Sequence, residues 1–168
     1  MARMIRPARL EDAAELAMVN VTSWQEAYRG LIDQAFLDSL DVADRTEAWD
    51  RILRQQRARV LVAEASDGVI GFCTVGQSSD QGWGEVFSIY LLPGQWGRGV
   101  GRRLLASGER ALSETGEQRA LLWVLDTNQR ARGFYERQGW MLAKPIRLEK
   151  FGEFDVTEVR YEKSLTPP

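Results

Sequence analysis

Apolar residues recur at helical spacing through the first third of the chain. From Asp12 to Gly30 they stand three or four residues apart, which places them on one face of a helix that ends at the glycine. Asp33 and Asp41 are candidate N-caps for two further helices. We expect these side chains of the three helices to face the core: Ala13, Leu16, Ala17, Val21, Trp24, Tyr28, Phe36, Leu37, Leu40, Trp49, Ile52 and Leu53.

Alternating or continuous apolar runs dominate the rest of the chain. They predict strands at residues 4–6, 59–65, 69–76, 85–91, 120–125, 140–148 and 154–161. Two more helices are predicted, one from Gly101 and one from Asn128 to Gly139. The tight-turn signal at residues 66–68 requires antiparallel strands, whereas the strand–helix–strand unit over residues 85–125 requires parallel ones. The sequence therefore predicts an α/β (α+β) domain over residues 1–168, with a mixed sheet of about seven strands and helices on both faces.

Charge and composition exclude several classes of protein. The 22 Lys and Arg residues are offset by 24 Asp and Glu residues, so the net charge of −2 gives no basis for nucleic-acid binding. No run of about 20 apolar residues predicts a membrane span, and no secretory signal is recognised. Histidine is absent, which excludes a Ser–His triad and a His-ligated metal; we expect no metal site. The single cysteine, Cys73, lies in an apolar strand pattern, so we expect an unreactive core thiol and a cytoplasmic protein.

Three alternating glycines, Gly97, Gly99 and Gly101, lead into the predicted helix that begins at the last of them. Residues 96–101 read Trp-Gly-Arg-Gly-Val-Gly, after a predicted strand and a Pro-Gly pair. The first N–H groups of a helix have no intrahelical acceptor, and glycines let the backbone approach a bulky anion. This arrangement favours a diphosphate, with Arg98, Arg102 and Arg103 available to neutralise further charge. The spacing matches neither the Walker A pattern nor the dinucleotide-binding glycine pattern.

The same residues resemble the coenzyme A motif of the GNAT acetyltransferase superfamily, Gln/Arg-x-x-Gly-x-Gly/Ala. Trp96 replaces the first residue of the motif, and Gly99 and Gly101 take its glycine positions. Residues 128–140 resemble a second motif of the family, Asn-x-x-Ala-x-x-Phe-Tyr-x-x-x-Gly-Phe, with Trp140 in place of the last Phe. The resemblance implies a GNAT-like fold, two splayed parallel strands at the cofactor site, and acetyl-coenzyme A as cosubstrate. It implies cofactor contacts from Ile89, Tyr90, Leu91, Trp96, Gly97, Arg98, Gly99, Val100, Gly101, Arg102, Asn128, Ala131 and Tyr135.

Two residues are candidates for moving protons during acyl transfer. An alkylamine titrates near pH 10, so a base or a relayed water must take its proton before it attacks. Glu85, at the start of the strand that leads to the glycine turn, is the candidate base; family members often use a carboxylate there. Tyr135, a phenol next to the cofactor's sulfur by resemblance, suits the acid that protonates the departing thiolate. The alternatives are a solvated strand-end acid and a core tyrosine.

The acceptor is not named by the sequence. Trp24 and Tyr28 lie one helical turn apart in a stretch similar to Trp-x-x-Ala-Tyr-x-Gly of one GNAT branch, and either line the acceptor site or pack in the core. The interpretation is an N-acetyltransferase that moves an acetyl group to a primary amine of a small molecule by direct attack in a ternary complex. A protein N-terminal or lysine acetyltransferase and a non-catalytic acyl-coenzyme A sensor remain alternatives. The family pattern also suggests a homodimer.

Overall fold

The computed structural model describes residues 4–165 of the chain. Seven strands and five α-helices follow one another in the order that the sequence predicts, with two short 3-10 helices, Leu10–Asp12 and Pro93–Gln95. The strands are β1 (Met4–Pro7), β2 (Arg59–Ala65), β3 (Gly68–Gln77), β4 (Gly84–Leu91), β5 (Arg119–Leu125), β6 (Met141–Phe151) and β7 (Phe154–Ser164). The helices are α1 (Ala13–Ala27), α2 (Gln34–Asp38), α3 (Val42–Gln55), α4 (Val100–Glu114) and α5 (Gln129–Arg137). Of the predicted domain, residues 1–3 and 166–168 lie outside the described residues.

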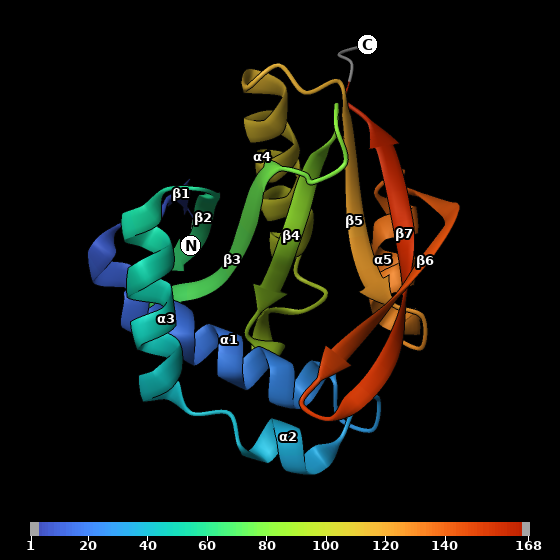
Figure 1. Ribbon diagram of the computed structural model, residues 1–168. Coiled ribbons are helices and arrows are strands. Elements are labelled where there is room, and N and C mark those ends of the chain that lie inside the picture. Colours follow the sequence, from blue (N-terminus) through green and yellow to red (C-terminus); the bar gives the residue numbers. More distant parts are fainter. Residues whose placement is uncertain (1–3, 166–168) are drawn as a thin grey trace.

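All seven strands form one mixed sheet in the order β1-β2-β3-β4-β5-β7-β6 (Figure 1). Every neighbouring pair is antiparallel except β4 and β5, which run parallel and are joined through α4. The last strand, β7, lies between β5 and β6, so the long β6–β7 hairpin forms the far end of the sheet. The predicted mixed sheet with a single crossover region is confirmed.

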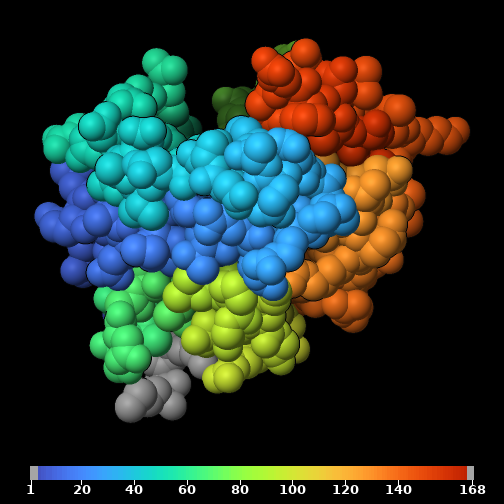
Figure 2. Space-filling view, turned by 90° about the horizontal axis from the view of Figure 1, so that it is seen from below, coloured from blue at the N-terminus to red at the C-terminus, as the bar shows by residue number. Residues whose placement is uncertain are grey.

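The two faces of the sheet carry different helices and different cores. Successive side chains of β2 point to opposite faces of the sheet. Leu61 and Ala63 pack with α4, whereas Val60 and Val62 pack with α1 and α3. The α4 face holds the larger core, which includes Trp140, Tyr161 and residues of α5. A third, smaller cluster under α2 joins the helices to Leu125. Figure 2 shows α1 and α2 crossing the underside, with α3 on one side and the β6–β7 hairpin and α5 on the other.

The three predicted helix N-caps are confirmed. Asp33, Asp41 and Asn128 each accept a hydrogen bond from the backbone N–H three residues later, at 2.9, 3.0 and 3.1 Å. The prediction that Ile52 faces the core is wrong. Its side chain is 38% exposed, because α3 buries mainly Trp49 against Phe72.

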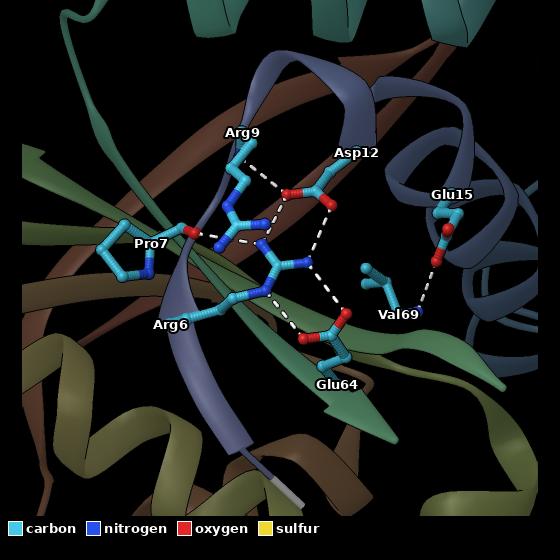
Figure 3. A network of polar contacts seen from close by, with 7 residues as sticks. All are labelled: Arg6, Pro7, Arg9, Asp12, Glu15, Glu64 and Val69. Carbon is cyan, nitrogen blue, oxygen red and sulfur yellow. Dashed lines mark hydrogen bonds and ion pairs between the residues drawn. The ribbon is translucent and has the colours of Figure 1, made fainter. Parts of the chain in front are cut away.

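Asp12 occupies the N-cap position of α1, but its side chain makes no capping hydrogen bond to that helix and instead anchors the N-terminal strand (Figure 3). Its carboxylate accepts hydrogen bonds from both terminal nitrogens of Arg6, at 2.8 and 2.9 Å, and from the Arg9 backbone N–H at 2.6 Å. Arg6 also binds Glu64 of β2, at 2.8 and 3.2 Å. The Arg6 side chain is only 11% exposed, so this pair of ion contacts ties β1 to β2 and to the start of α1.

Candidate active site

The parallel strands β4 and β5 pair at two positions only. The pairs are Gly84 with Ala120 and Glu85 with Leu121, and beyond them the strands separate. The separation coincides with a β-bulge in β4: Thr74 pairs with Ser88 and Val75 with Val86, so Phe87 is an extra residue. Because a bulge bends its strand, it helps turn β4 away from β5. The splayed parallel strands expected at the site are present.

A cavity of about 680 Å³ occupies this gap, a volume typical of small-molecule sites. It is lined from both sides of the sheet, by α1 on one side and by the N-terminus of α4 and α5 on the other. Most of the predicted site residues line it: Trp24, Tyr28, Glu85, Ile89, Tyr90, Leu91, Trp96, Gly97, Gly99, Gly101, Arg102, Asn128, Ala131 and Tyr135. Two do not: Val100 is buried in the larger core, and Arg98 is exposed.

The glycine turn presents open backbone donors to this cavity. Gly97 and Gly99 have φ of +72° and +76°, and no atom lies within 4 Å of where a Cβ would stand at either. The first hydrogen bond within α4 is donated by the Arg103 N–H to the Gly99 carbonyl, at 3.3 Å. The N–H groups before Arg103 in the helix therefore have no intrahelical acceptor. With the positive end of the helix dipole, they form a cradle that fits a diphosphate.

Trp96 takes part in the site through its ring. The guanidinium carbon of Arg130 lies 3.5 Å from the centroid of the indole ring, and the indole N–H donates to the Leu91 carbonyl at 3.0 Å. The Ser23 hydroxyl donates to the same carbonyl at 2.9 Å. The end of β4 is thus fixed by two side chains, and the Leu91 carbonyl is already in use. The Oε1 atom of Gln95, another residue that lines the cavity, is buried and has no hydrogen-bond partner in the described part of the chain. It can therefore accept a hydrogen bond from a bound ligand.

Glu85 is held by the loop that precedes β4. The Ser78 hydroxyl donates to its Oε2 atom at 2.7 Å, and the Asp80 N–H donates to Ser78 at 3.2 Å. Asp80 in turn forms an ion pair with Arg160 of β7. The Glu85 residue is 9% exposed, and burial raises the pKa of its carboxyl above the ordinary range. No sequence pattern shows this network, because the loop before β4 brings Ser78 back to Glu85 and the sheet brings Arg160 to Asp80.

Tyr135 lies across the cavity, on α5. Its ring packs against Phe134 and Trp140, with centroids 5.3 and 6.3 Å away, and the residue is 9% exposed. Burial raises the pKa of its hydroxyl well above 10, so the group stays protonated at neutral pH. It is both a cavity-lining and a core residue, and these two interpretations do not exclude each other.

Aromatic side chains close the α1 side of the cavity. The Trp24 ring lies 5.0 Å from that of Tyr28, 6.0 Å from Tyr90 and 5.2 Å from Phe151. The hydroxyls of Tyr28 and Tyr90 are hydrogen-bonded at 2.8 Å, and burial raises the pKa of Tyr28 to about 12. Trp24 and Tyr28 therefore line the cavity and also pack against the third core cluster, so the two sequence alternatives do not exclude each other. Phe151, near the tip of the β6–β7 hairpin, was missed because nothing near it in the sequence points to this site.

Comparisons with known proteins identify the family. Residues 21–140 match the family described as "Acetyltransferase (GNAT) family". The chain belongs to the GNAT family. The uncharacterized N-acetyltransferase YuaI of Bacillus subtilis is 32% identical over 74% of this chain and 72% of its own length. An uncharacterized N-acetyltransferase of Archaeoglobus fulgidus is also 32% identical, over 80% of this chain and 90% of its own.

Solved structures agree on the fold. The PaiA N-acetyltransferase from Thermoplasma acidophilum, crystallised in complex with coenzyme A, superposes with a TM-score of 0.77 at 22% identity, over 98% of this chain and 99% of that chain. The expected family, fold class and class of enzyme, an acetyltransferase, are confirmed. Within residues 4–165, no helix of this GNAT protein is both long and apolar enough to cross a membrane.

Proposed function

We propose that this GNAT protein transfers the acetyl group of acetyl-coenzyme A to a primary amine of a small molecule, by direct attack while both are bound. The observation that carries the proposal is the single cavity at the β4–β5 gap. It is lined by the glycine turn from one side, by the aromatic cluster from the other, and by Glu85 and Tyr135. Such a cavity lets two ligands meet from opposite faces of the sheet.

The positions of the cavity-lining residues indicate which of them would hold the cofactor. Bound acetyl-coenzyme A would supply an activated acetyl group and a thiolate leaving group. The N-terminus of α4 would hold its diphosphate, with Arg102 adding charge, and Trp96 and Arg130 would pack against the neighbouring part. Asn128 and Ala131 line the same wall, at the start of α5.

Glu85 is proposed as the base. A buried carboxyl with a raised pKa binds a proton more readily than an exposed one, which suits removal of a proton from an ammonium group. The hydrogen bond from Ser78 opposes the rise in the pKa of Glu85 that burial causes, and it fixes the direction of the carboxylate. Tyr135, protonated at neutral pH, is proposed as the acid for the departing thiolate.

An enclosed aromatic wall favours a small acceptor over a protein segment. Trp24, Tyr28, Tyr90 and Phe151 pack ring against ring at 5.0–6.4 Å and form one wall of the cavity, whose volume suits a small molecule. A cytoplasmic location and a homodimer are part of the same proposal, and gel filtration tests the second.

Free-thiol release from acetyl-coenzyme A, measured with a panel of amines, tests the function. We expect turnover with at least one small amine and initial-rate plots that intersect. Tyr135→Phe should lower kcat by roughly 10²–10⁴, with little change in cofactor affinity. Glu85→Gln should lower the rate most at low pH, where the amine most needs a base. Thiol release that no amine accelerates, with intact cofactor binding, would favour the acyl-coenzyme A sensor instead.

A further inference from the structure

A second cavity, of about 400 Å³, lies beside the active-site cavity on the α1 and α3 face of the sheet. The two cavities share four lining residues, Trp24, Phe87, Ser88 and Tyr90. Ser88 and Tyr90 are on this face because they contact Thr74 and Phe72: the Thr74 and Ser88 hydroxyl oxygens lie 2.6 Å apart, and the Tyr90 and Phe72 rings lie 5.7 Å apart. The second cavity therefore continues the acceptor side of the site and is distant from the glycine turn.

Apolar side chains form most of this second cavity and stay partly open to solvent. Trp49 and Phe72 form its base, and Phe87 and Ile52 are 47% and 38% exposed. Phe87 is the bulged residue of β4, so the same irregularity that bends the strand also exposes this ring. Exposed apolar side chains gathered at a cavity are typical of a ligand-binding surface.

The charged residues that line the second cavity are all basic, whereas the lining of the main cavity holds both acids and arginines. The charged residues that line the second cavity are Arg45 and Arg57, without an acid. The Arg45 guanidinium carbon lies 5.7 Å from the centroid of the Trp24 ring, and neither arginine has an ion pair within residues 4–165. The acids of the main cavity are Glu85, Glu149 and Glu158, of which Glu158 is paired with Arg147. Arg102 and Arg130 line the same cavity beside the glycine turn and Trp96.

We infer that the acceptor is an amine that carries a carboxylate at the far end of an apolar body. The inference rests on the proposed function and narrows its substrate class. The amine lies at Glu85, the apolar body lies over Phe87 and Trp24, and the carboxylate binds Arg45, with Arg57 adding charge. Arginine suits this role because its planar donors match a carboxylate. An acceptor with its carboxylate next to the amine places that charge beside Glu85, so a remote carboxylate is favoured over an α-amino acid.

Matched acceptors test the inference. The acceptor set is a series of ω-aminoalkanoates of increasing length, each paired with the n-alkylamine of the same number of carbons. We expect the best ω-aminoalkanoate to have a kcat/KM at least tenfold above its paired alkylamine. Arg45→Gln should abolish this preference by raising KM for the carboxylate compound, while kcat and the kinetics of the alkylamine stay unchanged.

Arg54→Gln is the matched control. Arg54 is also an arginine of α3, is 62% exposed, pairs with Asp50 at 2.7 Å and lines neither cavity. Its removal should leave the preference intact. Calorimetry of ω-aminoalkanoate binding to the coenzyme A-saturated protein supplies a readout that does not need turnover.

The outcomes separate the two proposals. Arg45-dependent binding of carboxylate compounds without turnover would support the inference and overturn the proposed function. Acetylation of alkylamines as fast as their carboxylate partners would overturn the inference and leave the proposed function standing. A preference that survives Arg45→Gln would also overturn it, as would the absence of both binding and turnover.

Discussion

Replacing Asp12 with Asn tests how the N-terminal strand is attached to the sheet. The change keeps the shape of the side chain and removes its charge. The parent carboxylate is 9% exposed and accepts three hydrogen bonds, two of them from Arg6. Removing one partner of a fully buried ion pair costs about 3–5 kcal/mol. Arg6 keeps its second partner, Glu64, in the variant, so we expect a smaller loss of about 2–3 kcal/mol in the free energy of unfolding.

The pH dependence of that loss follows from the sign of the pKa shift. The hydrogen bonds from Arg6, and then from the Arg9 N–H, hold the pKa of Asp12 below its ordinary value. Asp12 therefore contributes stability above the pKa that it has in the unfolded chain, and this contribution is lost as the pH falls through its lower pKa in the folded protein. The difference in the free energy of unfolding between the parent and Asp12→Asn should accordingly be largest at neutral pH and shrink at acid pH.

Urea unfolding followed by circular dichroism, at neutral and at acid pH, measures both effects. For a domain of this size, the expected loss corresponds to a fall in Tm of about 4–12 °C. Asp67→Asn is the control, because Asp67 is exposed and contacts the neighbouring Ser66 hydroxyl. Equal unfolding midpoints for parent and Asp12→Asn at neutral pH would refute the reasoning. A difference in unfolding free energy that stays constant down to acid pH would refute only the predicted pH dependence.

Three further predictions concern the site. Gly99→Val should weaken acetyl-coenzyme A binding tenfold or more, about 1.4 kcal/mol, as measured by calorimetry. Gly30→Val is the control, since Gly30 has a similar φ of +74° and similar open space, and it should leave the affinity unchanged. Equal affinities of the two variants for acetyl-coenzyme A would contradict a diphosphate site at the glycine turn. Ser78→Ala deletes a bond that lowers the pKa of Glu85, so the acid limb of the pH–rate profile should move to higher pH; an unmoved limb would contradict Glu85 as the base. Cys73→Ala should keep most activity, because the thiol is fully buried and burial raises its pKa to about 12; an acetylated Cys73 by mass spectrometry would refute this.

Local signals predicted the elements of the fold, and long-range contacts decided the rest. Helix caps such as Asp33 and Asn128 depend on residues three positions away, so the sequence displays them directly. The Arg6–Glu64 contact joins residues 58 positions apart, and no short pattern encodes it. The position of β7 between β5 and β6 also depends on which strands meet in space.

The residues of the candidate site also fall into those that the sequence predicts and those that only long-range contacts bring together. The glycine turn was predictable because a single short run of residues supplies its backbone donors, and Trp96 in the first motif position leaves that run unchanged. Ser78 and Phe151 were not predictable, since one reaches Glu85 through a loop and the other enters at a hairpin tip. The Phe87 bulge was missed because its register depends on β3.

The two faces of the sheet therefore place different demands on the sequence. On the α4 face, the proposed diphosphate site consists of backbone N–H groups, which tolerate side-chain changes as long as the glycines remain. A short family motif can therefore be recognised there. On the α1 and α3 face, the cavities are lined by side chains from several separate segments, four of which contain Trp24, Arg45, Phe87 and Phe151. None of these four residues belongs to the glycine turn. Under our proposal, the choice of acceptor depends on these side chains outside the family motif, and the kinetics of Arg45→Gln with matched acceptors measure it.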